Sequence, residues 1–196
     1  LSFHALREYG PGDDRRYVHW RSSAKTGTLM VRQFEETRRS HMVVALSAQD
    51  RDYAESEEFE LAISAVGSLG LEAIRSSKDL TAMATHEVIP STTSRQLLDG
   101  LTRLESVSSP LTLVDLARSV TRDVLRATVV VLVCGSSVSA RDIRAAGAVL
   151  PLGVRALAIQ TETGVERGVS RLGSVTVLKL GALQDLPRGF RRMERV

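Results

Sequence analysis

Apolar residues follow two different periods along this chain. Residues 42–46 are a continuous apolar run and residues 128–134 are nearly so, which is typical of strands that are covered on both faces. Between them, apolar residues recur at helical spacing from about residue 55 to residue 76 and then alternate over residues 79–85. The pattern predicts a strand, a long helix, a second strand and, later, a third, buried strand.

The alternation of helices and strands continues beyond these elements. We expect a short extended piece at 86–90, a helix that contains Leu97, Leu98, Leu101 and Leu104, helices that begin near Thr112 and near Ser139, strands at 156–161 and 175–180, and a helix over about 183–193. Thr112 and Ser139 each stand three residues before an aspartate, which is the spacing of a helix cap. Residues 161–173 are polar and contain glycine, so we expect a surface loop there.

This order of elements predicts an α/β fold that consists of two parts. Strands that alternate with helices build a mostly parallel sheet with helices on both faces, as in Rossmann-like folds. Residues 1–27 are instead polar and rich in turn signals, above all at 10–14, where Gly-Pro-Gly precedes two aspartates. A strand at 28–34 follows. We therefore expect an N-terminal segment, residues 1–40, that forms an extended flap packed on the core, and a domain over residues 41–196.

Composition agrees with a folded domain and excludes some classes of protein. Apolar residues make up 43% of the 196 residues and charged residues 25%, so disorder is excluded for most of the chain. The only cysteine, Cys134, lies in a predicted buried strand; an internal disulfide is excluded and a structural thiol is expected. No apolar run reaches the roughly 18 to 20 residues that span a bilayer, and the sequence does not begin with a signal peptide.

The positive charge of the chain is concentrated near its start. The formal net charge is +3, and residues 1–41 alone hold eight Arg or Lys against five Asp or Glu. Such a segment can bind nucleic acid, anionic lipid or an acidic protein. Its basic residues alternate with acids, which favours a solvated surface of salt bridges and no nucleic-acid partner. Nucleic-acid or anion binding through this segment is the alternative, and nucleic-acid affinity would fall steeply with salt.

The most distinctive residues of the sequence lie in the same segment. They are Arg7, Tyr9, Asp13, Asp14, Arg16, His19 and Trp20. A stretch of small residues, a Gly-Thr-Leu piece at 27–29 and a strand that ends in Phe34–Glu35 follow them. This order, with Arg-x-Tyr, Gly-Asp-Asp, Arg, His-Trp and finally Phe-Glu, closely resembles the signature of the domain of unknown function number 58 family. The resemblance extends over residues 7–35.

The resemblance implies a von Willebrand factor A-like domain. It also implies a bacterial, membrane-associated protein whose anchor precedes this sequence, with the domain on the cytoplasmic side of the membrane. A MoxR-type AAA+ ATPase is the partner that it implies. No biochemical activity is established for the family, so the resemblance supplies a fold and a partner but no reaction.

The charged residues of the signature have two alternative interpretations. Arginine forms forked pairs of hydrogen bonds with carboxylates, so a network of Arg7, Arg16 and the aspartates of the turn is expected. This network would pin the segment to the core, with His19 as a further member and Trp20 over the end of the sheet. Alternatively, Arg7, Arg16 and His19 form a binding site for an anion or a peptide terminus. Buried ion pairs satisfy one another, which favours the structural interpretation.

Many von Willebrand factor A domains bind Mg²⁺ through an Asp-x-Ser-x-Ser motif after the first central strand. In this sequence Ser47 stands at the position of the leading aspartate, and Gln49 and Arg51 stand at the two serine positions. Asp50 and Asp52 are the nearest acids, with Arg51 between them. Since Mg²⁺ needs hard oxygen ligands, we expect a degenerate site near Ser47, Gln49 and Asp50 and no bound cofactor. A Mg²⁺-dependent adhesion domain is the alternative.

The sequence contains no recognisable catalytic motif. It lacks a Gly-rich phosphate loop, a dinucleotide-binding Gly-x-Gly-x-x-Gly, a Gly-x-Ser-x-Gly elbow and a pair of histidines at zinc spacing. A triad of residues that are far apart in sequence leaves no such trace, so an unrecognised hydrolase stays an alternative. We expect a non-catalytic assembly module that binds a protein partner, an AAA+ ATPase, at the carboxyl ends of its strands. The loops at 47–54 and 135–139 would form that surface.

Overall fold

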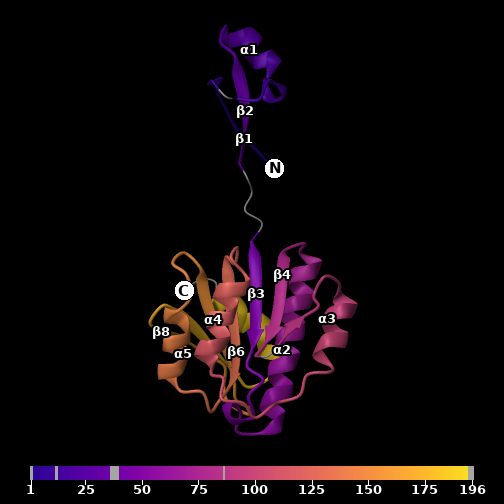
Figure 1. Cartoon of the computed structure of the whole chain (residues 1–196), viewed down its shortest axis with the longest axis vertical. Helices are drawn as coiled ribbons and strands as arrows, with labels where there is room; N and C mark the ends of the chain where they lie inside the picture. The colour runs from indigo at the N-terminus through magenta and orange to yellow at the C-terminus, as the bar shows by residue number, and fades with distance from the viewer. Residues whose placement is uncertain (1, 12, 36–39, 86, 194–196) are drawn as a thin grey trace. The chain divides into compact units, whose positions relative to one another are not determined.

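A computed structural model describes residues 2–11, 13–35, 40–85 and 87–193 of the chain. Gly12 of the predicted turn and His86 of the predicted extended piece lie outside the described residues. The chain divides into two compact units: unit 1 is Leu1–Arg39 and unit 2 is Ser40–Val196 (Figure 1). The expectation that residues 1–40 pack on the core stays a prediction.

Unit 1 contains an antiparallel pair of strands and a short helix. Strand β1 (Ser2–Glu8) pairs with β2 (Met30–Glu35), with Arg7 opposite Val31 and Glu8 opposite Met30. The expected strand at 28–34 is therefore present, but its partner β1 was not predicted. Instead of an extended flap alone, the segment forms a two-stranded sheet. The apolar residues of β1 do not keep a strict two-residue period, so its sequence alone did not indicate a strand.

The connection between these strands holds the 3₁₀ turn η1 (Arg15–Tyr17) and the helix α1 (Trp20–Thr26). His19 caps α1, since its Nδ1 accepts a hydrogen bond from the Ser22 amide. The helix ends at Gly27, whose φ of 75° is left-handed and favours glycine. The Ser23 hydroxyl then accepts a hydrogen bond from the Met30 amide at 2.8 Å, which ties α1 to β2.

Unit 2 is built on one seven-stranded sheet. Its strands lie in the order β5 (Val88–Ile89), β4 (Asp79–Ala84), β3 (His41–Leu46), β6 (Val129–Gly135), β7 (Arg155–Thr161), β9 (Val175–Leu180) and β8 (Gly168–Leu172). The five central strands are parallel, and the two edge strands β5 and β8 are antiparallel to their neighbours. The predicted mostly parallel sheet is confirmed.

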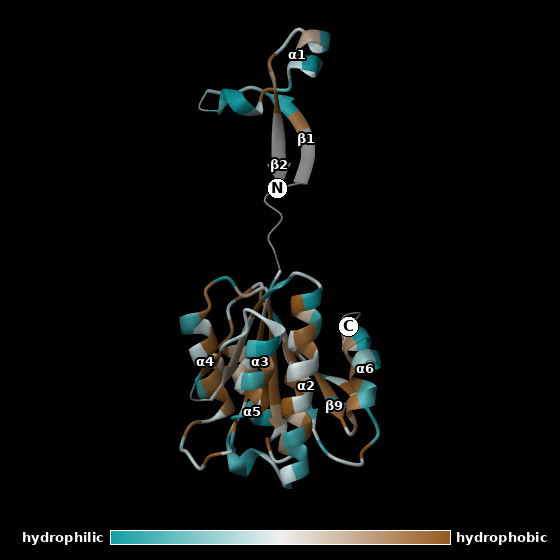
Figure 2. Ribbon diagram, turned by 90° about the vertical axis from the view of Figure 1, so that its right-hand side faces the viewer, coloured by the Kyte–Doolittle hydropathy of each residue, from teal (hydrophilic) through white to brown (hydrophobic). Residues whose placement is uncertain are grey.

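Helices cover both faces of this sheet (Figures 1 and 2). The helices α2 (Ser56–Arg75), α3 (Ser94–Leu101) and α6 (Leu186–Met193) pack on one face, and α4 (Leu113–Asp123) and α5 (Ala140–Ala148) pack on the other. Two 3₁₀ turns, η2 (Asp50–Asp52) and η3 (Leu183–Asp185), precede α2 and α6. The predicted caps are also present, since Thr112 and Asp115 form a capping box and Ser139 caps α5.

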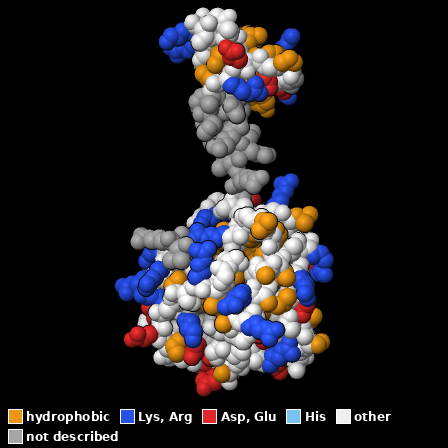
Figure 3. All heavy atoms as spheres, turned by 90° about the vertical axis from the view of Figure 1, so that its left-hand side faces the viewer, with side chains coloured by type: hydrophobic (Ala, Val, Ile, Leu, Met, Phe, Trp, Pro, Cys, Tyr) orange, Lys and Arg blue, Asp and Glu red, His pale blue; other side chains and the backbone are white. Residues whose placement is uncertain are grey.

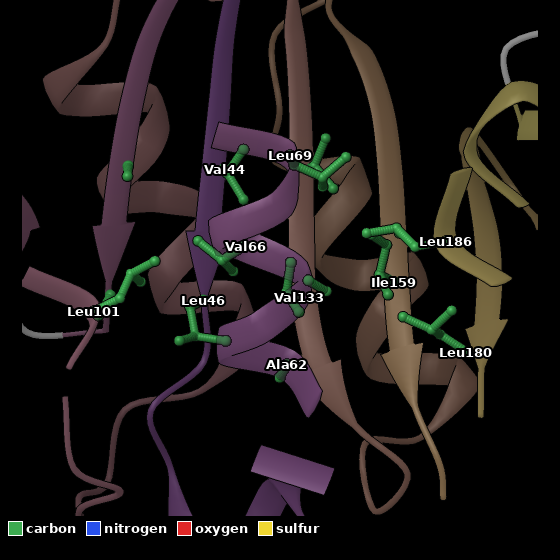
Figure 4. Packing of buried hydrophobic residues seen from close by; sticks show 14 of the residues in the cluster. Val44, Leu46, Ala62, Val66, Leu69, Leu101, Val133, Ile159, Leu180 and Leu186 are labelled. Atoms are coloured by element: carbon green, nitrogen blue, oxygen red, sulfur yellow. The ribbon is translucent and has the colours of Figure 1, made fainter. Parts of the chain in front are cut away.

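The core consists of two apolar layers that the sheet separates. Along β3, Val44 and Leu46 face Val66 of α2 (Figure 4). Val43 and Ala45 belong to the opposite layer, under α4 and α5. Both faces are covered, so every residue in this strand can be apolar. This explains why residues 42–46 form an unbroken apolar run in the sequence.

The expected surface loop at 161–173 is wrong in part, because it contains the edge strand β8. Its residues are half-buried or exposed, so they show no apolar period, and pairing with β9 through a turn at Gly173 (φ 65°) forms the strand. Within the described ranges, no helix has the length and apolar character needed to cross a membrane.

Candidate functional site

The carboxyl ends of the parallel strands meet at one edge of the unit 2 sheet, which we call the rim. It consists of residues 47–54, Glu58, Thr85, residues 135–139 and Gln160. Ligands of open α/β sheets usually bind at such an edge. Several polar side chains of the rim are nevertheless buried, including Ser47, which is 1% exposed, and Glu58, which is 3% exposed.

Ser47 directly follows β3 and is hydrogen bonded on two sides. Its hydroxyl donates to Oδ2 of Asp52 at 2.5 Å, and its carbonyl accepts a hydrogen bond from the Tyr53 hydroxyl at 2.5 Å. Its amide donates to the Val133 carbonyl at 2.8 Å, which continues the pairing of β3 with β6. Ser47 is therefore part of the framework of the rim and is not presented to solvent.

Asp52 lies at the end of η2, where the chain turns back over the end of the sheet. Burial raises the pKa of this carboxyl above its ordinary value, and the hydrogen bond from Ser47 and the nearby Arg51 charge offset part of that shift. The Asp52 carbonyl accepts a hydrogen bond from the Ser137 amide at 3.2 Å. Asp52 thus connects the loop after β3 with the loop after β6.

Glu58 connects the same two loops through α2. Its Oε2 accepts hydrogen bonds from the Ala54 amide (3.0 Å), the Ser136 amide (3.2 Å) and the Ser136 hydroxyl (2.9 Å). This role of Glu58 was not predicted from the sequence. A signal was available, because Glu58 precedes the buried residues Ala62, Ala65 and Leu69 at helical spacing and so lies on the inward stripe of α2.

Gly135 allows the two loops to approach each other closely. A Cβ atom at this position would collide with the Asp52 carbonyl oxygen and with the ring of Tyr53. On the other side of the loop, the Gln160 side-chain amide donates to the Val138 carbonyl at 2.8 Å. The backbone of residues 135–138 is therefore held from two directions.

The residues of the predicted degenerate metal site lie at the rim in different environments. Ser47 and Gln49 are buried, whereas Asp50 is exposed and its Oδ1 accepts a hydrogen bond from the Arg51 amide at 2.7 Å. Gln49 pairs with Val107 in an isolated parallel bridge. Across the residues that the structure describes, no group of three or more His, Cys, Asp or Glu side chains is placed to hold a metal ion.

The oxygen atoms of the rim that could serve as ligands fit the coordination of Mg²⁺ poorly. Mg²⁺ demands a near-octahedral set of oxygen ligands, usually with at least one carboxylate. The hydroxyl of Ser47, the residue predicted to replace the first carboxylate of the motif, donates a hydrogen bond to Asp52. The Oε2 atom of the second buried carboxylate, Glu58, already accepts three hydrogen bonds.

The signature aspartates of unit 1 form two separate pairs with arginines. Arg7 donates to both carboxylate oxygens of Asp13, at 2.7 and 2.6 Å, and Arg16 donates to Asp14 at 2.9 and 2.6 Å. The hydrogen bonds from Arg7, followed by one from the Gly10 amide, lower the pKa of Asp13. Those from the side chain and the backbone of Arg16 lower the pKa of Asp14.

The remaining signature residues do not join these pairs. His19 Nδ1 lies 2.8 Å from the Ser22 hydroxyl and serves the start of α1. Trp20 is 68% exposed, and Tyr9 is half-buried with its amide bonded to the Leu29 carbonyl at 2.8 Å. The three proposed anion ligands therefore contact different partners: Arg7 binds Asp13, Arg16 binds Asp14 and His19 binds Ser22.

Comparison with known proteins gives a family and no activity. Residues 5–182 match the family described as Protein of unknown function DUF58. Searches of curated proteins and of solved structures found no match. The matched range includes the signature of unit 1 and the rim of unit 2, and it covers most of the 196 residues. The chain therefore belongs to the family of proteins of unknown function DUF58.

Proposed function

We propose that unit 2 is a von Willebrand factor A-like domain that binds a protein partner through its rim and catalyses no reaction. The observation that carries this proposal is the mutual hydrogen bonding of the buried rim side chains. Ser47 bonds to Asp52 and Glu58 bonds to Ser136. Groups that are buried and already bonded are poorly placed to act on a substrate, but they hold the exposed backbone and side chains of the loops in a fixed shape.

The exposed residues of the rim would form the contact. Ser137 and Ser139 in the loop after β6, and Asp50, Arg51 and Ala54 in the loop after β3, are all exposed. Rigid loops lose little conformational entropy when they bind, so a fixed rim favours association with a partner. A MoxR-type AAA+ ATPase is the proposed partner, at the cytoplasmic side of a bacterial membrane to which an upstream anchor holds the protein.

A co-precipitation experiment tests this proposal. The chain is immobilised and incubated with a MoxR-type ATPase in the presence of ATP, ADP or no nucleotide. We expect association that depends on the nucleotide. Ser137→Arg should weaken it, since the new side chain projects from the rim, whereas Leu152→Arg should not, because Leu152 is fully exposed in the loop before the amino end of β7. The proposal is contradicted if both variants retain equal amounts of the ATPase, or if the ATPase does not associate in any nucleotide state.

The hydrogen bonding of the rim oxygens also favours a partner that is bound without a bridging cation. A bridging Mg²⁺ needs free oxygen ligands on the domain, whereas Ser47 Oγ and Asp52 Oδ2 are directed at each other and Glu58 Oε2 accepts three hydrogen bonds. Titration with Mg²⁺ or Mn²⁺ in a calorimeter should give no saturable heat. Saturable heat that a chelator abolishes would support the Mg²⁺-dependent adhesion domain instead.

A further inference from the structure

Two adjoining hollows run along the outer side of α2. One has a volume of about 360 Å³ and is lined by α2, α3 and Leu183 of η3. The other has a volume of about 450 Å³ and lies between the first turns of α2 and residues 104–106. Glu60 and Leu104 line both hollows, so together they form one groove, which we call the α2 groove. Figure 2 shows α2 and α3 side by side on this surface.

The floor of the α2 groove is apolar. Its large apolar side chains are those of Tyr53, Phe59, Ile63, Leu71, Leu98, Leu101, Leu104 and Leu183. Leu98 is 43% exposed and Leu183 is 38% exposed. Exposed leucines are ordinary when they are scattered singly, but here they lie in one concave surface, and apolar concave surfaces are where proteins bind ligands and partner segments.

The edge of the groove is acidic. Four exposed residues with carboxylates, Asp50, Glu55, Glu60 and Glu105, line it, and none of the described residues in its lining is Lys or Arg. The ion pairs between described residues include none of these four. The positive end of α2 amounts to about half a charge, which four carboxylates outweigh.

This acidity is local and does not follow from the composition of unit 2. Residues 40–196 hold eighteen Arg or Lys and eighteen Asp or Glu, so the unit carries no formal net charge. Figure 3 shows a different face of unit 2, over which Lys and Arg side chains are spread. The α2 groove therefore stands out as an apolar surface with a negative edge on a unit that is neutral as a whole.

We infer that the α2 groove binds a segment of a partner protein that carries Arg or Lys beside an apolar side. The apolar residues of the segment would lie on the leucines of the floor, and its cations would face the four carboxylates. Charge complementarity of this kind speeds association and rejects acidic segments. The inference rests on the proposed function because it takes the partner to be a protein, and it adds the chemistry of the segment that is bound.

Selection from a phage library of random peptides tests this inference without knowledge of the partner. The library is selected on the immobilised full chain, and enriched peptides are synthesised with a fluorescent label for affinity measurement by anisotropy. We expect the enriched peptides to contain Arg or Lys next to leucine-like residues. Their affinity should fall as salt is added, because the carboxylates are exposed and salt screens them.

Paired variants locate the binding surface. Glu60→Lys combined with Glu105→Lys should weaken the selected peptides about tenfold or more, since two attractive charges become repulsive. Glu166→Lys is the matched control, an exposed acid in the loop between β7 and β8 that should leave the affinity unchanged. Leu98→Asn should also weaken binding, whereas Leu125→Asn, at a residue that is 88% exposed and outside the groove, should not.

The outcomes separate this inference from the proposed function. The inference that a basic segment binds the groove is overturned by enrichment of acidic or uncharged peptides, by no enrichment at all, or by unchanged binding to the Glu60→Lys and Glu105→Lys variant. This holds even if the ATPase associates with the rim. A chain that is dimeric and becomes monomeric with Leu98→Asn also overturns it, because a second copy then covers the groove. Basic peptides that bind the groove while the ATPase never associates would overturn the proposed partner and leave the inference standing.

Discussion

Asp13 in unit 1 and Asp52 at the rim of unit 2 are identical side chains with opposite pKa shifts. Arg7 lowers the pKa of Asp13 through two hydrogen bonds at the surface, where the arginine side chain is 47% exposed. Burial raises the pKa of Asp52, which is 9% exposed and faces a neutral hydroxyl. The first carboxylate has a cation as its hydrogen-bond partner, whereas the second accepts a hydrogen bond from a neutral hydroxyl, and the nearby Arg51 charge offsets burial only in part.

This difference indicates where polar groups matter for the fold. An exposed ion pair contributes little, because water and salt compete with it. A buried carboxylate that accepts several hydrogen bonds leaves its donors unsatisfied when it is removed, and each such donor is costly. We therefore expect variants of the rim to have large effects and variants of the signature pairs to have small ones.

Glu58→Ala should have the largest effect and tests the rim side of this comparison. It removes the acceptor of the Ala54 and Ser136 amides, so we expect the free energy of unfolding to fall by about 3 kcal/mol. Glu58→Gln should lower the free energy of unfolding by less, since the glutamine side chain keeps an oxygen as acceptor. Urea unfolding followed by far-ultraviolet circular dichroism measures both. Glu57→Ala is the control, because Glu57 is exposed and, among the described residues, its carboxylate accepts a hydrogen bond from the neighbouring Ser56 side chain alone; a loss of stability equal to that of Glu58→Ala breaks the comparison.

Gly135→Ala should have the next largest effect. The added methyl group would overlap the Asp52 carbonyl and the Tyr53 ring, so the two loops would have to separate, at a cost of about 2 kcal/mol. Gly168→Ala is the matched control, because nothing lies within 4 Å of a Cβ atom there and its φ is ordinary. The same unfolding measurement applies. If Gly135→Ala matches the control, the loops are not packed as closely as the rim requires.

The elements that could be predicted from the sequence are those in which burial sets the spacing of apolar residues. The predicted strand at 42–46 and helix at 55–76 correspond to β3 and α2 within one residue at each end. The strand β8 and the elements β1 and α1 could not be predicted in this way. Their residues are mostly polar, and their structure depends on pairing with another strand or on capping. The sequence of each element therefore shows no clear period that predicts it.

The loops at 47–54 and 135–139 lie at the carboxyl ends of β3 and β6, as predicted, but the contacts between them were not predicted. Ser47 and Gln49 lie at the end of β3, as the position of the motif predicts. The bond between Glu58 and Ser136 joins residues 78 positions apart, and no local period contains it. A sequence shows that a helix has an inward stripe, but it does not show which distant backbone amides an acid on that stripe will meet.

Asp52→Asn gives a smaller effect that depends on pH. Because the folded-state pKa is raised, the folded chain holds this proton more tightly than the unfolded chain does. The contribution of Asp52 to stability is therefore fully present below its ordinary pKa of 3.8 and is lost as pH rises through the raised value. The unaltered chain should lose stability relative to Asp52→Asn as pH rises above 3.8, as urea unfolding at a range of pH values would show. A difference that is constant over this range contradicts the raised pKa.

Arg7→Ala should have the smallest effect, on the titration of Asp13, and it tests the surface side of the comparison. The Gly10 amide donates to Asp13 Oδ2 at 2.8 Å, so its proton resonance reports whether this carboxylate is ionised. The titration midpoint in the unaltered chain should lie below 3.8, and Arg7→Ala should move it upward, because the hydrogen bonds from Arg7 are the largest cause of the shift. The contribution of Asp13 to stability is present above its ordinary pKa and lost as pH falls through the lowered value, and added salt should shrink it. Arg21→Ala, at an exposed arginine of α1, should leave the midpoint in place. If Arg7→Ala also leaves the titration midpoint of Asp13 unchanged, water has displaced Arg7 from this carboxylate. The signature aspartates then differ from those of the rim only in exposure.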